Sequence, residues 1–280
     1  IGQPVIFHME NEEWYLKKET GRLERSQVNA YCATKEDIKS MVKFISSYSL
    51  YAYEDEMKRG FITMQGGHRI GVAGQVVMDG GKVLSLSNIY FLNIRVAREK
   101  RGCAKDIIPY LIHRNNIYNT LFVSPPGIGK TTYLRDAIRI LSNGSDRLHG
   151  MKISIIDERS EIAACRQGIP QNDIGIRSDV LDGCLKSFGM LLMLRSMAPQ
   201  IIAVDEIGSR EDCRAMEQAI YSGSRIIGTV HAYDMKELSR KKYLKEMLEQ
   251  QMFGRIVLLE KAENGRRRFH IYDENLEKIC

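Results

Sequence analysis

The sequence predicts an α/β protein in which helices cover a mostly parallel sheet and a small α+β domain comes first. Two observations support this prediction. After Gly102, apolar runs of strand length alternate with longer segments of helical periodicity. Before about Lys100, one helical segment is followed by short β-like runs between glycine pairs. We therefore expect a small N-terminal domain over residues 1–101 and a large domain over residues 102–280.

The expected elements of the N-terminal domain begin with a helix. Thr34 is a suitable N-cap, because its hydroxyl can accept a hydrogen bond from the first turn. The apolar face of this helix consists of Ile38, Met41, Val42 and Ile45. The strands expected after it are residues 61–65, 69–73, 76–78 and 91–96.

In the large domain, the expected strands are residues 120–124, 152–157, 201–205 and 225–230. A helix is expected over residues 209–222, with Ser209 as its N-cap and Gly223 at its end. Near the C-terminus, two apolar runs flank Asn264-Gly265, a dipeptide typical of a tight β-hairpin. We expect these runs, residues 255–259 and 268–272, to pair as antiparallel strands.

One loop carries the strongest functional signal. Residues 124–132 fit the phosphate-loop pattern G-x-x-x-x-G-K-[ST], except that Ser124 replaces the first glycine. An apolar strand precedes the loop and an amphipathic helix follows it, so backbone N–H groups and a helix N-terminus can together bind an anion. The expected nucleotide-binding residues are Ser124, Pro125, Pro126, Gly127, Ile128, Gly129, Lys130, Thr131 and Thr132.

These residues predict ATP or GTP as the ligand, together with Mg²⁺, and ATP is the cofactor that we expect. Gly127 and Gly129 permit the backbone angles that the loop needs. Lys130 would bridge the β- and γ-phosphates, and the Thr131 hydroxyl would be one Mg²⁺ ligand.

Acidic residues stand at the ends of two of the expected strands. Asp205 and Glu206 follow one apolar run, and Asp157 and Glu158 follow another. Parallel strands present their C-terminal ends along one edge of a sheet, so all four could face bound phosphates. Asp205 would hold Mg²⁺ through its water shell, and either Glu206 or Glu158 would activate the attacking water. Helix capping or ion pairing is the alternative role for Asp157 and Glu158.

Other polar residues could complete a catalytic site. Thr229 and His231 end a further apolar strand, where either could sense the γ-phosphate. Hydrolysis on such a fold usually needs a cation beyond the loop lysine, and the N-terminal domain offers Arg69, Arg95 and Arg98. These arginines could act within their own chain or on a neighbouring subunit.

Charge, cysteine spacing and hydropathy bear on the expected partners, metal sites and membrane association. The formal net charge is +6, but no basic run exceeds three residues, so an ordinary solvated surface explains the charge as well as an anionic partner does. The six cysteines lack C-x-x-C pairs and metal-ligand spacing, which predicts reduced thiols. No apolar run approaches the ~18 residues of a membrane span. The chain begins at Ile1, so we expect a short preceding piece and no signal peptide.

Longer strings are more specific than the phosphate loop. They are Gly67-His-Arg-Ile-Gly-Val-Ala-Gly74, Asp157-Glu-Arg-Ser-Glu-Ile162, Gln167-Gly-Ile-Pro-Gln-Asn-Asp-Ile-Gly-Ile-Arg177, Asp179-Val-Leu-Asp-Gly-Cys184 and Ala203-Val-Asp-Glu-Ile-Gly208. Together they closely resemble the stage III sporulation protein AA family, over nearly the whole chain.

The resemblance implies a RecA-like P-loop ATPase domain related to the ATPases of type II and type IV secretion. It implies a homo-oligomeric ring, a hexamer, in which each N-terminal domain clamps nucleotide. The ring would lie at the cytoplasmic face of the membrane, on the mother-cell side. There it would energise the channel between mother cell and forespore, with integral membrane proteins of that channel as partners.

Residue by residue, the resemblance matches Ser124 to Thr132 with the Walker A loop and Glu206 with the Walker B glutamate. Glu158 lies in the acidic box that supplies the catalytic glutamate, and His231 matches the histidine box. Secretion motors commonly carry glycine where this chain has Asp205, which is a departure from their pattern.

Two other functions stay open. A nucleic-acid-stimulated translocase is one, since RecA-like ATPases often act on DNA and the chain is basic, although nucleic acid is not the partner that we expect. A scaffold that binds nucleotide with little turnover is the other.

Overall fold

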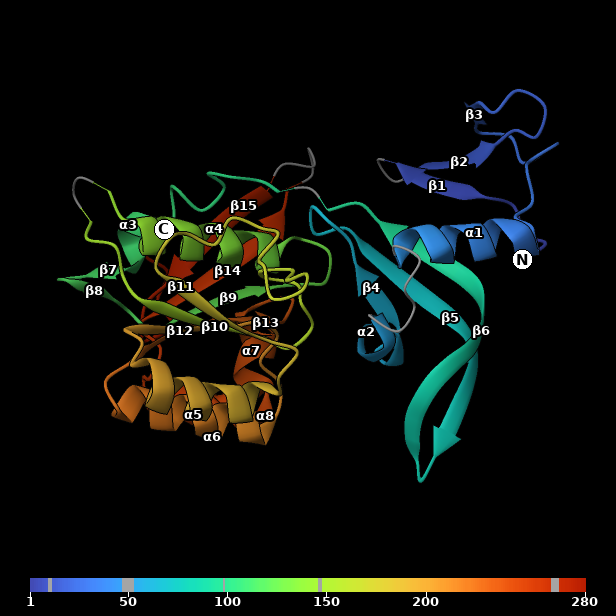
Figure 1. The fold of residues 1–280 in the computed structure, drawn as a ribbon. Coiled ribbons are helices and arrows are strands. Elements are labelled where there is room, and N and C mark those ends of the chain that lie inside the picture. The colour runs from blue at the N-terminus through green and yellow to red at the C-terminus, as the bar shows by residue number, and fades with distance from the viewer. Residues whose placement is uncertain (10–11, 47–52, 98, 146–147, 263–266) are drawn as a thin grey trace. The chain divides into compact units, whose positions relative to one another are not determined.

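The structure, a computed structural model, describes residues 1–9, 12–46, 53–97, 99–145, 148–262 and 267–280. They fall into two compact units, Ile1–Ala97 and Arg98–Cys280 (Figure 1).

The N-terminal unit opens with an antiparallel sheet of three short strands that the sequence does not predict. The strands are β1 Ile6–Met9, β2 Glu12–Leu16 and β3 Leu23–Glu24. Their side chains are exposed or only half-buried, so no alternation of buried and exposed positions marks them in the sequence.

Helix α1 (Lys35–Ile45) follows, and its predicted N-cap is confirmed. The Thr34 hydroxyl accepts a hydrogen bond from the Asp37 N–H at 3.1 Å, and the Asp37 carboxylate accepts one from the Thr34 N–H at 2.8 Å. The buried face is narrower than predicted: Val42 and Ile45 are buried, whereas Met41 is exposed.

The second sheet of this unit has the order β4-β5-β6 and is antiparallel. Helix α2 (Glu54–Lys58) precedes its strands, which are β4 Phe61–Thr63, β5 Arg69–Asp79 and β6 Lys82–Arg95. The two predicted strands at residues 69–73 and 76–78 are one strand, β5, whose register against β6 shifts beside Gly74. A Cβ atom at Gly74 would lie 1.7 Å from the carbonyl oxygen of Asn88, so only glycine fits this shift.

The C-terminal unit is built on a seven-stranded sheet with the order β11-β10-β12-β13-β9-β14-β15. Its strands are β9 Thr120–Ser124, β10 Ile153–Asp157, β11 Ser178–Asp182, β12 Ile201–Val204, β13 Arg225–His231, β14 Arg255–Lys261 and β15 Arg267–Tyr272. All neighbouring pairs are parallel except β14 and β15. The predicted mostly parallel sheet is therefore confirmed. A small hairpin, β7 (Ile112–His113) and β8 (Asn116–Ile117), lies outside this sheet.

Helices cover both faces of this sheet (Figure 1). Helices α3 (Ile108–Leu111) and α4 (Lys130–Asn143) lie on one face. The other face is covered by α5 Lys186–Met197, α6 Arg210–Tyr221, α7 Met235–Arg240 and α8 Lys242–Glu249. Alternate residues of β9 enter the two cores, with Phe122 on the α4 side and Leu121 and Val123 on the α5–α8 side. Burial on both faces explains why the strand reads as a continuous apolar run.

The capping prediction for α6 is also confirmed, since the Ser209 hydroxyl accepts a hydrogen bond from the Asp212 N–H at 3.0 Å. The strands of the predicted C-terminal hairpin pair as expected, as β14 and β15. Its predicted turn at Asn264-Gly265 lies outside the described residues.

The six cysteines are all free thiols, in three environments. Burial raises the pKa of Cys165 to about 12 and the pKa values of Cys103 and Cys213 to about 11. Cys32 and Cys280 are exposed.

We expect only Cys32 and Cys280 to react quickly with Ellman's reagent in the native protein at pH 8, because the thiolate is the nucleophile. Cys184 should react more slowly, since burial also raises its pKa. Absorbance would give the rates, and mass mapping of alkylated peptides would identify the sites. Unfolding in guanidinium should make all six react. Rapid native labelling of Cys165 would contradict the packing described above.

Candidate functional site

The phosphate loop has the strand-loop-helix setting that the sequence predicts. It leaves β9 at Ser124 and enters α4 at Lys130. Gly127 has a φ of 79° and Gly129 a φ of 110°, values that favour glycine. Among the residues that the structure describes, no side chain caps the N-terminus of α4. Its first N–H groups therefore need another acceptor, such as a bound anion.

Ser124 replaces a glycine at no conformational cost. It is the last residue of β9 and is fully buried, in extended backbone. Its hydroxyl donates a hydrogen bond to the Pro125 carbonyl at 2.7 Å. The turn therefore starts after Ser124, and this position does not need a left-handed backbone.

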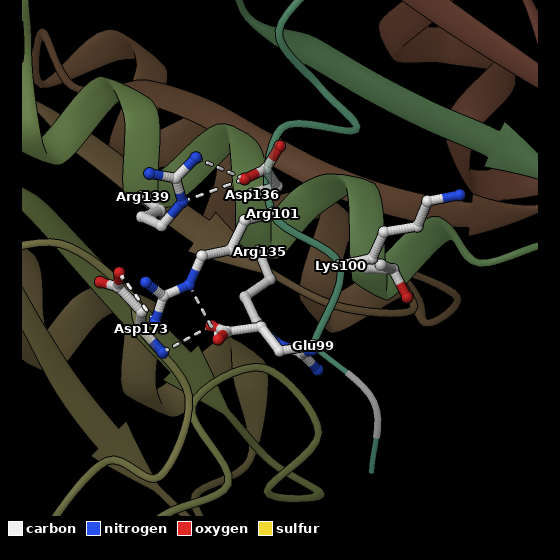
Figure 2. Close-up of a pocket in the computed structure, with 8 residues that line it drawn as sticks. Glu99, Lys100, Arg101, Arg135, Asp136, Arg139 and Asp173 are labelled. Carbon is white, nitrogen blue, oxygen red and sulfur yellow. Dashed lines mark hydrogen bonds and ion pairs between the residues drawn. The ribbon is translucent and has the colours of Figure 1, made fainter.

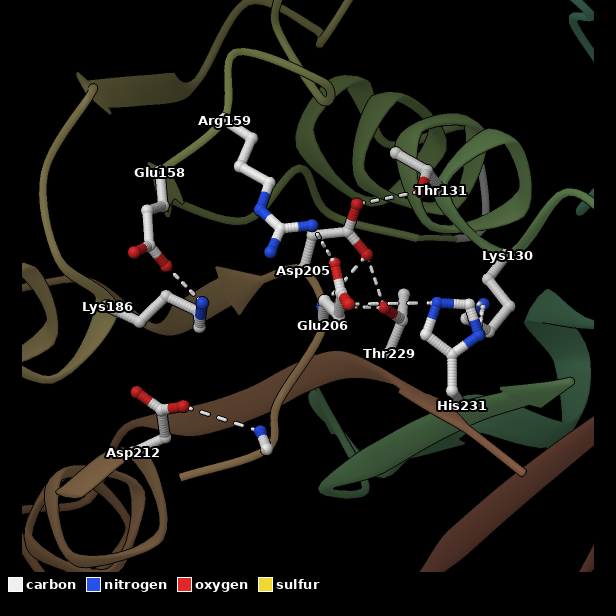
Figure 3. A network of polar contacts seen from close by, with 11 residues as sticks. Lys130, Thr131, Glu158, Arg159, Lys186, Asp205, Glu206, Asp212, Thr229 and His231 are labelled. Carbon is white, nitrogen blue, oxygen red and sulfur yellow. Dashed lines mark hydrogen bonds and ion pairs between the residues drawn. The ribbon is translucent and has the colours of Figure 1, made fainter. Parts of the chain in front are cut away.

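Asp205 lies at the centre of a polar network at the C-terminal edge of the sheet (Figure 3). Its Oδ2 accepts a hydrogen bond from the Thr131 hydroxyl at 2.7 Å, and its Oδ1 accepts a short one from the Thr229 hydroxyl. Thr229 is fully buried on β13. The structure thus brings together the two residues predicted to hold Mg²⁺, and both offer the oxygen donors that Mg²⁺ prefers.

Glu206 is held in an unusual backbone conformation beside Asp205. Its φ is 51°, which is uncommon outside glycine. Its N–H donates to the Asp205 Oδ1 at 3.0 Å and to the Thr229 hydroxyl at 2.8 Å. Its carboxylate pairs with the Arg159 guanidinium at 2.6 Å and lies 3.9 Å from the His231 Nε2 atom. The backbone bonds keep this side chain at the strand edge, where Figure 3 shows it next to Asp205.

Lys130 and His231 are in direct contact. The Lys130 Nζ atom lies 2.9 Å from Nδ1 and 3.4 Å from Nε2 of His231. Lys130 is only 6% exposed, and this burial lowers its pKa, while the charges of Asp205 and Glu206 act in the opposite direction. A protonated Lys130 needs an unprotonated ring nitrogen as acceptor, so the geometry favours neutral His231.

The other acidic strand end, Asp157-Glu158, is arranged differently. The Asp157 carboxylate is 1% exposed and accepts hydrogen bonds from the N–H groups of Glu161, Ile162 and Ala163 at 2.7, 3.0 and 2.8 Å. Burial raises its pKa, and these bonds oppose the rise. Asp157 therefore shapes the following loop, in line with the capping role left open above. Glu158 forms a short ion pair with Lys186 of α5.

Both candidate glutamates line the same pocket at this edge. Its lining consists of Asp157, Glu158, Arg159, Glu161, Lys186, Asp205 and Glu206. Arg159, Glu161 and Lys186 are the members that the sequence did not single out as candidates. The only sequence signal for Arg159 was its position directly after the Asp-Glu pair. No local pattern indicates Lys186, because this residue comes from α5, a separate element.

A second pocket connects α4 with the chain that enters the C-terminal unit (Figure 2). The Asp136 carboxylate accepts hydrogen bonds from the N–H groups of Gly102 and Ala104 at 3.0 and 2.8 Å, and pairs with Arg139 at 2.7 Å. Glu99 and Asp173 pair with Arg101. These charges are matched within the protein, so the pocket serves to anchor the segment that precedes α3.

The predicted arginines belong to the N-terminal unit. Arg69 on β5 and Arg95 on β6 are directly opposite each other, and the Arg69 guanidinium lies 3.6 Å from the centre of the Phe61 ring. Arg98 lies outside the described residues. The catalytic role of all three stays a prediction.

The sheet order, the loop after β9 and the acidic end of β12 define a RecA-like P-loop fold. Solved structures of other proteins share this fold. The pilus retraction motor PilT with bound ADP matches with a TM-score of 0.60 at 15% identity, over 96% of this chain and 76% of that one. The Legionella pneumophila ATPase DotB matches with a TM-score of 0.58 at 16% identity, over 94% and 74%. The protein thus has the fold of secretion ATPases.

The chain belongs to the family described as sporulation stage III, protein AA, whose family model matches residues 1–279. It is 42% identical to stage III sporulation protein AA of Bacillus subtilis over 246 residues, which cover 88% of this chain and 80% of that protein. The predicted family is therefore confirmed. In the described part of the chain, every helix is too short or too polar to cross a bilayer.

We expect Thr229→Val to lower the free energy of unfolding by about 1–3 kcal/mol, because it removes the buried hydroxyl that bonds both the Glu206 N–H and the Asp205 carboxylate. Valine keeps the shape of threonine and lacks only the hydroxyl. Urea denaturation followed by circular dichroism would measure the change. Thr229→Ser, which keeps the hydroxyl, should retain slow amide exchange at Glu206, whereas Thr229→Val should lose it. Unchanged exchange in both variants would show that the hydroxyl does not hold Glu206.

Proposed function

We propose that the protein is a Mg²⁺-dependent ATP hydrolase, a motor of the secretion-ATPase kind. It energises a membrane-embedded sporulation complex between mother cell and forespore, acting at the cytoplasmic, mother-cell face of the membrane. The observation that carries this proposal is the hydrogen bond between Thr131 of the phosphate loop and Asp205 after β12. It brings the phosphate loop, two oxygens suited to Mg²⁺ and Glu206 together at one sheet edge, which supports a nucleotide and metal site there.

The residues fit ATP with Mg²⁺. Among the described residues, no group of three His, Cys, Asp or Glu side chains could hold a metal by itself. Mg²⁺ usually binds through one or two protein oxygens, water and substrate phosphates, and Thr131 and Asp205 supply such oxygens. When bound, the ion would neutralise charge on the β- and γ-phosphates. Lys130 adds positive charge, and the uncapped N-terminus of α4 offers N–H donors to the same phosphates.

We assign the water-activating role to Glu206 rather than to Glu158. Glu206 follows the metal-site residue directly, and two backbone hydrogen bonds anchor it to Asp205 and Thr229. Glu158 is instead held by Lys186. Because Arg159 pairs with the Glu206 carboxylate, this pair must loosen before Glu206 can accept a proton from water.

We expect slow Mg²⁺-dependent ATP hydrolysis, lost in Lys130→Ala and lowered about 10²–10⁴-fold in kcat in Glu206→Gln, the range for loss of a general base. Phosphate release would be measured with and without EDTA. Glu158→Gln tests the alternative assignment, and the exposed Glu211 supplies a matched control in Glu211→Gln. Loss of kcat in Glu158→Gln with normal turnover in Glu206→Gln would reverse the assignment. Normal turnover in Lys130→Ala would exclude the proposed site.

A nucleotide-gated scaffold is the second candidate, and two contacts favour it. Glu206 is paired with Arg159, and Lys130 is in contact with His231, so both key side chains have protein partners. A single-turnover measurement separates the candidates. A scaffold would bind ATP and leave it intact over many minutes.

We further propose that the protein works as a homo-oligomeric ring, a hexamer, in which an arginine of the N-terminal unit completes the site of a neighbour. The family membership and the fold of secretion motors support this. Arg69, Arg95 and Arg98 are the candidates, and Arg95 is the best one to test because it is exposed in a described strand.

If Arg95 acts on a neighbouring subunit, Arg95→Ala and Lys130→Ala should each be inactive alone and partly active when mixed. A mixed interface then contains an intact lysine and an intact arginine. Arginine action within one chain predicts no recovery on mixing. Arg22→Ala, which changes an exposed arginine of the same unit, should hydrolyse ATP normally. Native mass measurement with an ATP analogue would report the ring, and a monomer under all conditions would exclude the trans model.

A further inference from the structure

Arg267 lies against the phosphate loop from the side opposite Asp205. It is the first residue of β15, which pairs with β14, and β14 in turn pairs with β9, the strand that leads into the loop. A Cβ atom built on Gly129 would lie 3.2 Å from Cζ and from Nη2 of Arg267, and 3.4 Å from Nη1. These three distances are nearly equal. The guanidinium therefore lies with its flat face toward Gly129.

No described residue matches the charge of Arg267. Within the described residues, its guanidinium has no hydrogen bond and no ion pair, and the residue is exposed. It lies instead beside Gly129, the N-cap of α4, where the helix dipole is positive, and next in sequence is the Lys130 ammonium. The Arg267 guanidinium and the N-terminal end of the α4 dipole thus lie side by side, which favours an anion between them.

The sheet order decides which part of a bound nucleotide this group can reach. The sequence of strands is β12-β13-β9-β14-β15, so Asp205 and Glu206 lie two strands to one side of the loop and Arg267 two strands to the other. Metal binding and hydrolysis belong to the β12 side. The β15 side would therefore face the nucleoside and the α-phosphate, which are remote from the bond that is cleaved.

We propose that Arg267 binds the α-phosphate of the nucleotide, on the nucleoside side of the loop. This inference rests on the proposed nucleotide function and adds a binding residue that the sequence motif does not contain. Arg267 would contribute equally to binding ADP and ATP, because both carry the α-phosphate. It would leave the hydrolysis step itself unchanged.

The chain offers a matched control in the next residue. Arg268 is also an exposed arginine of β15, but successive strand residues point to opposite faces, and its cross-strand neighbour is Glu260. Arg267→Ala and Arg268→Ala thus remove the same charge from positions one residue apart. Neither change removes a buried contact, so both variants should melt at the temperature of the unchanged protein.

The test is calorimetric binding of ADP and of a non-hydrolysable ATP analogue, with Mg²⁺, to the full chain. Arg267→Ala should weaken both ligands about 10- to 100-fold, by the same factor, as expected for loss of a charge-assisted hydrogen bond. Arg268→Ala should bind within about twofold of the unchanged protein, and Arg267→Lys should lose less than Arg267→Ala. Adenosine, which lacks phosphate, should bind Arg267→Ala and the unchanged protein equally, and kcat at saturating ATP should stay the same.

Equal ADP affinity in Arg267→Ala and Arg268→Ala would overturn the inference. So would a loss confined to the ATP analogue, because that result would place Arg267 at the γ-phosphate. The proposed function is tested separately by Lys130→Ala. If the unchanged protein binds no nucleotide, both conclusions fall. If it binds nucleotide through Lys130 and Arg267→Ala binds equally well, only the role of Arg267 is lost.

Discussion

The carboxylate of Asp205 is the interaction on which the rest of the site depends. It follows β12, and its two oxygens accept hydrogen bonds from Thr131 on α4 and Thr229 on β13. Glu206 is fixed to the same pair through its backbone N–H. One half-buried acceptor thus ties together a strand end, the neighbouring strand and the first turn of the loop helix. Polar networks of this kind define a single geometry when each member is satisfied.

The parallel sheet determines which residues can reach that carboxylate. Strands β9, β12 and β13 run in the same direction, so their last residues emerge together along one edge. Helices bury both faces of these strands, and the polar groups of the site are gathered at the strand ends. The described strands of the N-terminal unit are antiparallel, so their C-terminal ends do not emerge together along one edge.

Local patterns predict the strands that build the site, because the runs before Ser124, Asp205 and His231 are apolar and end in polar residues. They do not reveal edge strand β11, whose sequence Ser-Asp-Val-Leu-Asp is at most half-buried. The ion pairs of Arg159 with Glu206 and of Lys186 with Glu158 are equally invisible. They depend on long side chains from separate elements, and only the folded sheet brings such side chains together.

The contact between Lys130 and His231 has a consequence for ligand selectivity. A buried ammonium without any acceptor would be costly, and the imidazole relieves that cost with a neutral nitrogen. A phosphate that binds Lys130, as proposed, would have to displace this acceptor. A neutral ligand gains little by the exchange, whereas a multiply charged one replaces a weak partner with a strong one. If the loop binds nucleotide as proposed, His231 would compete with the incoming phosphate for Lys130 and would thereby favour highly charged ligands.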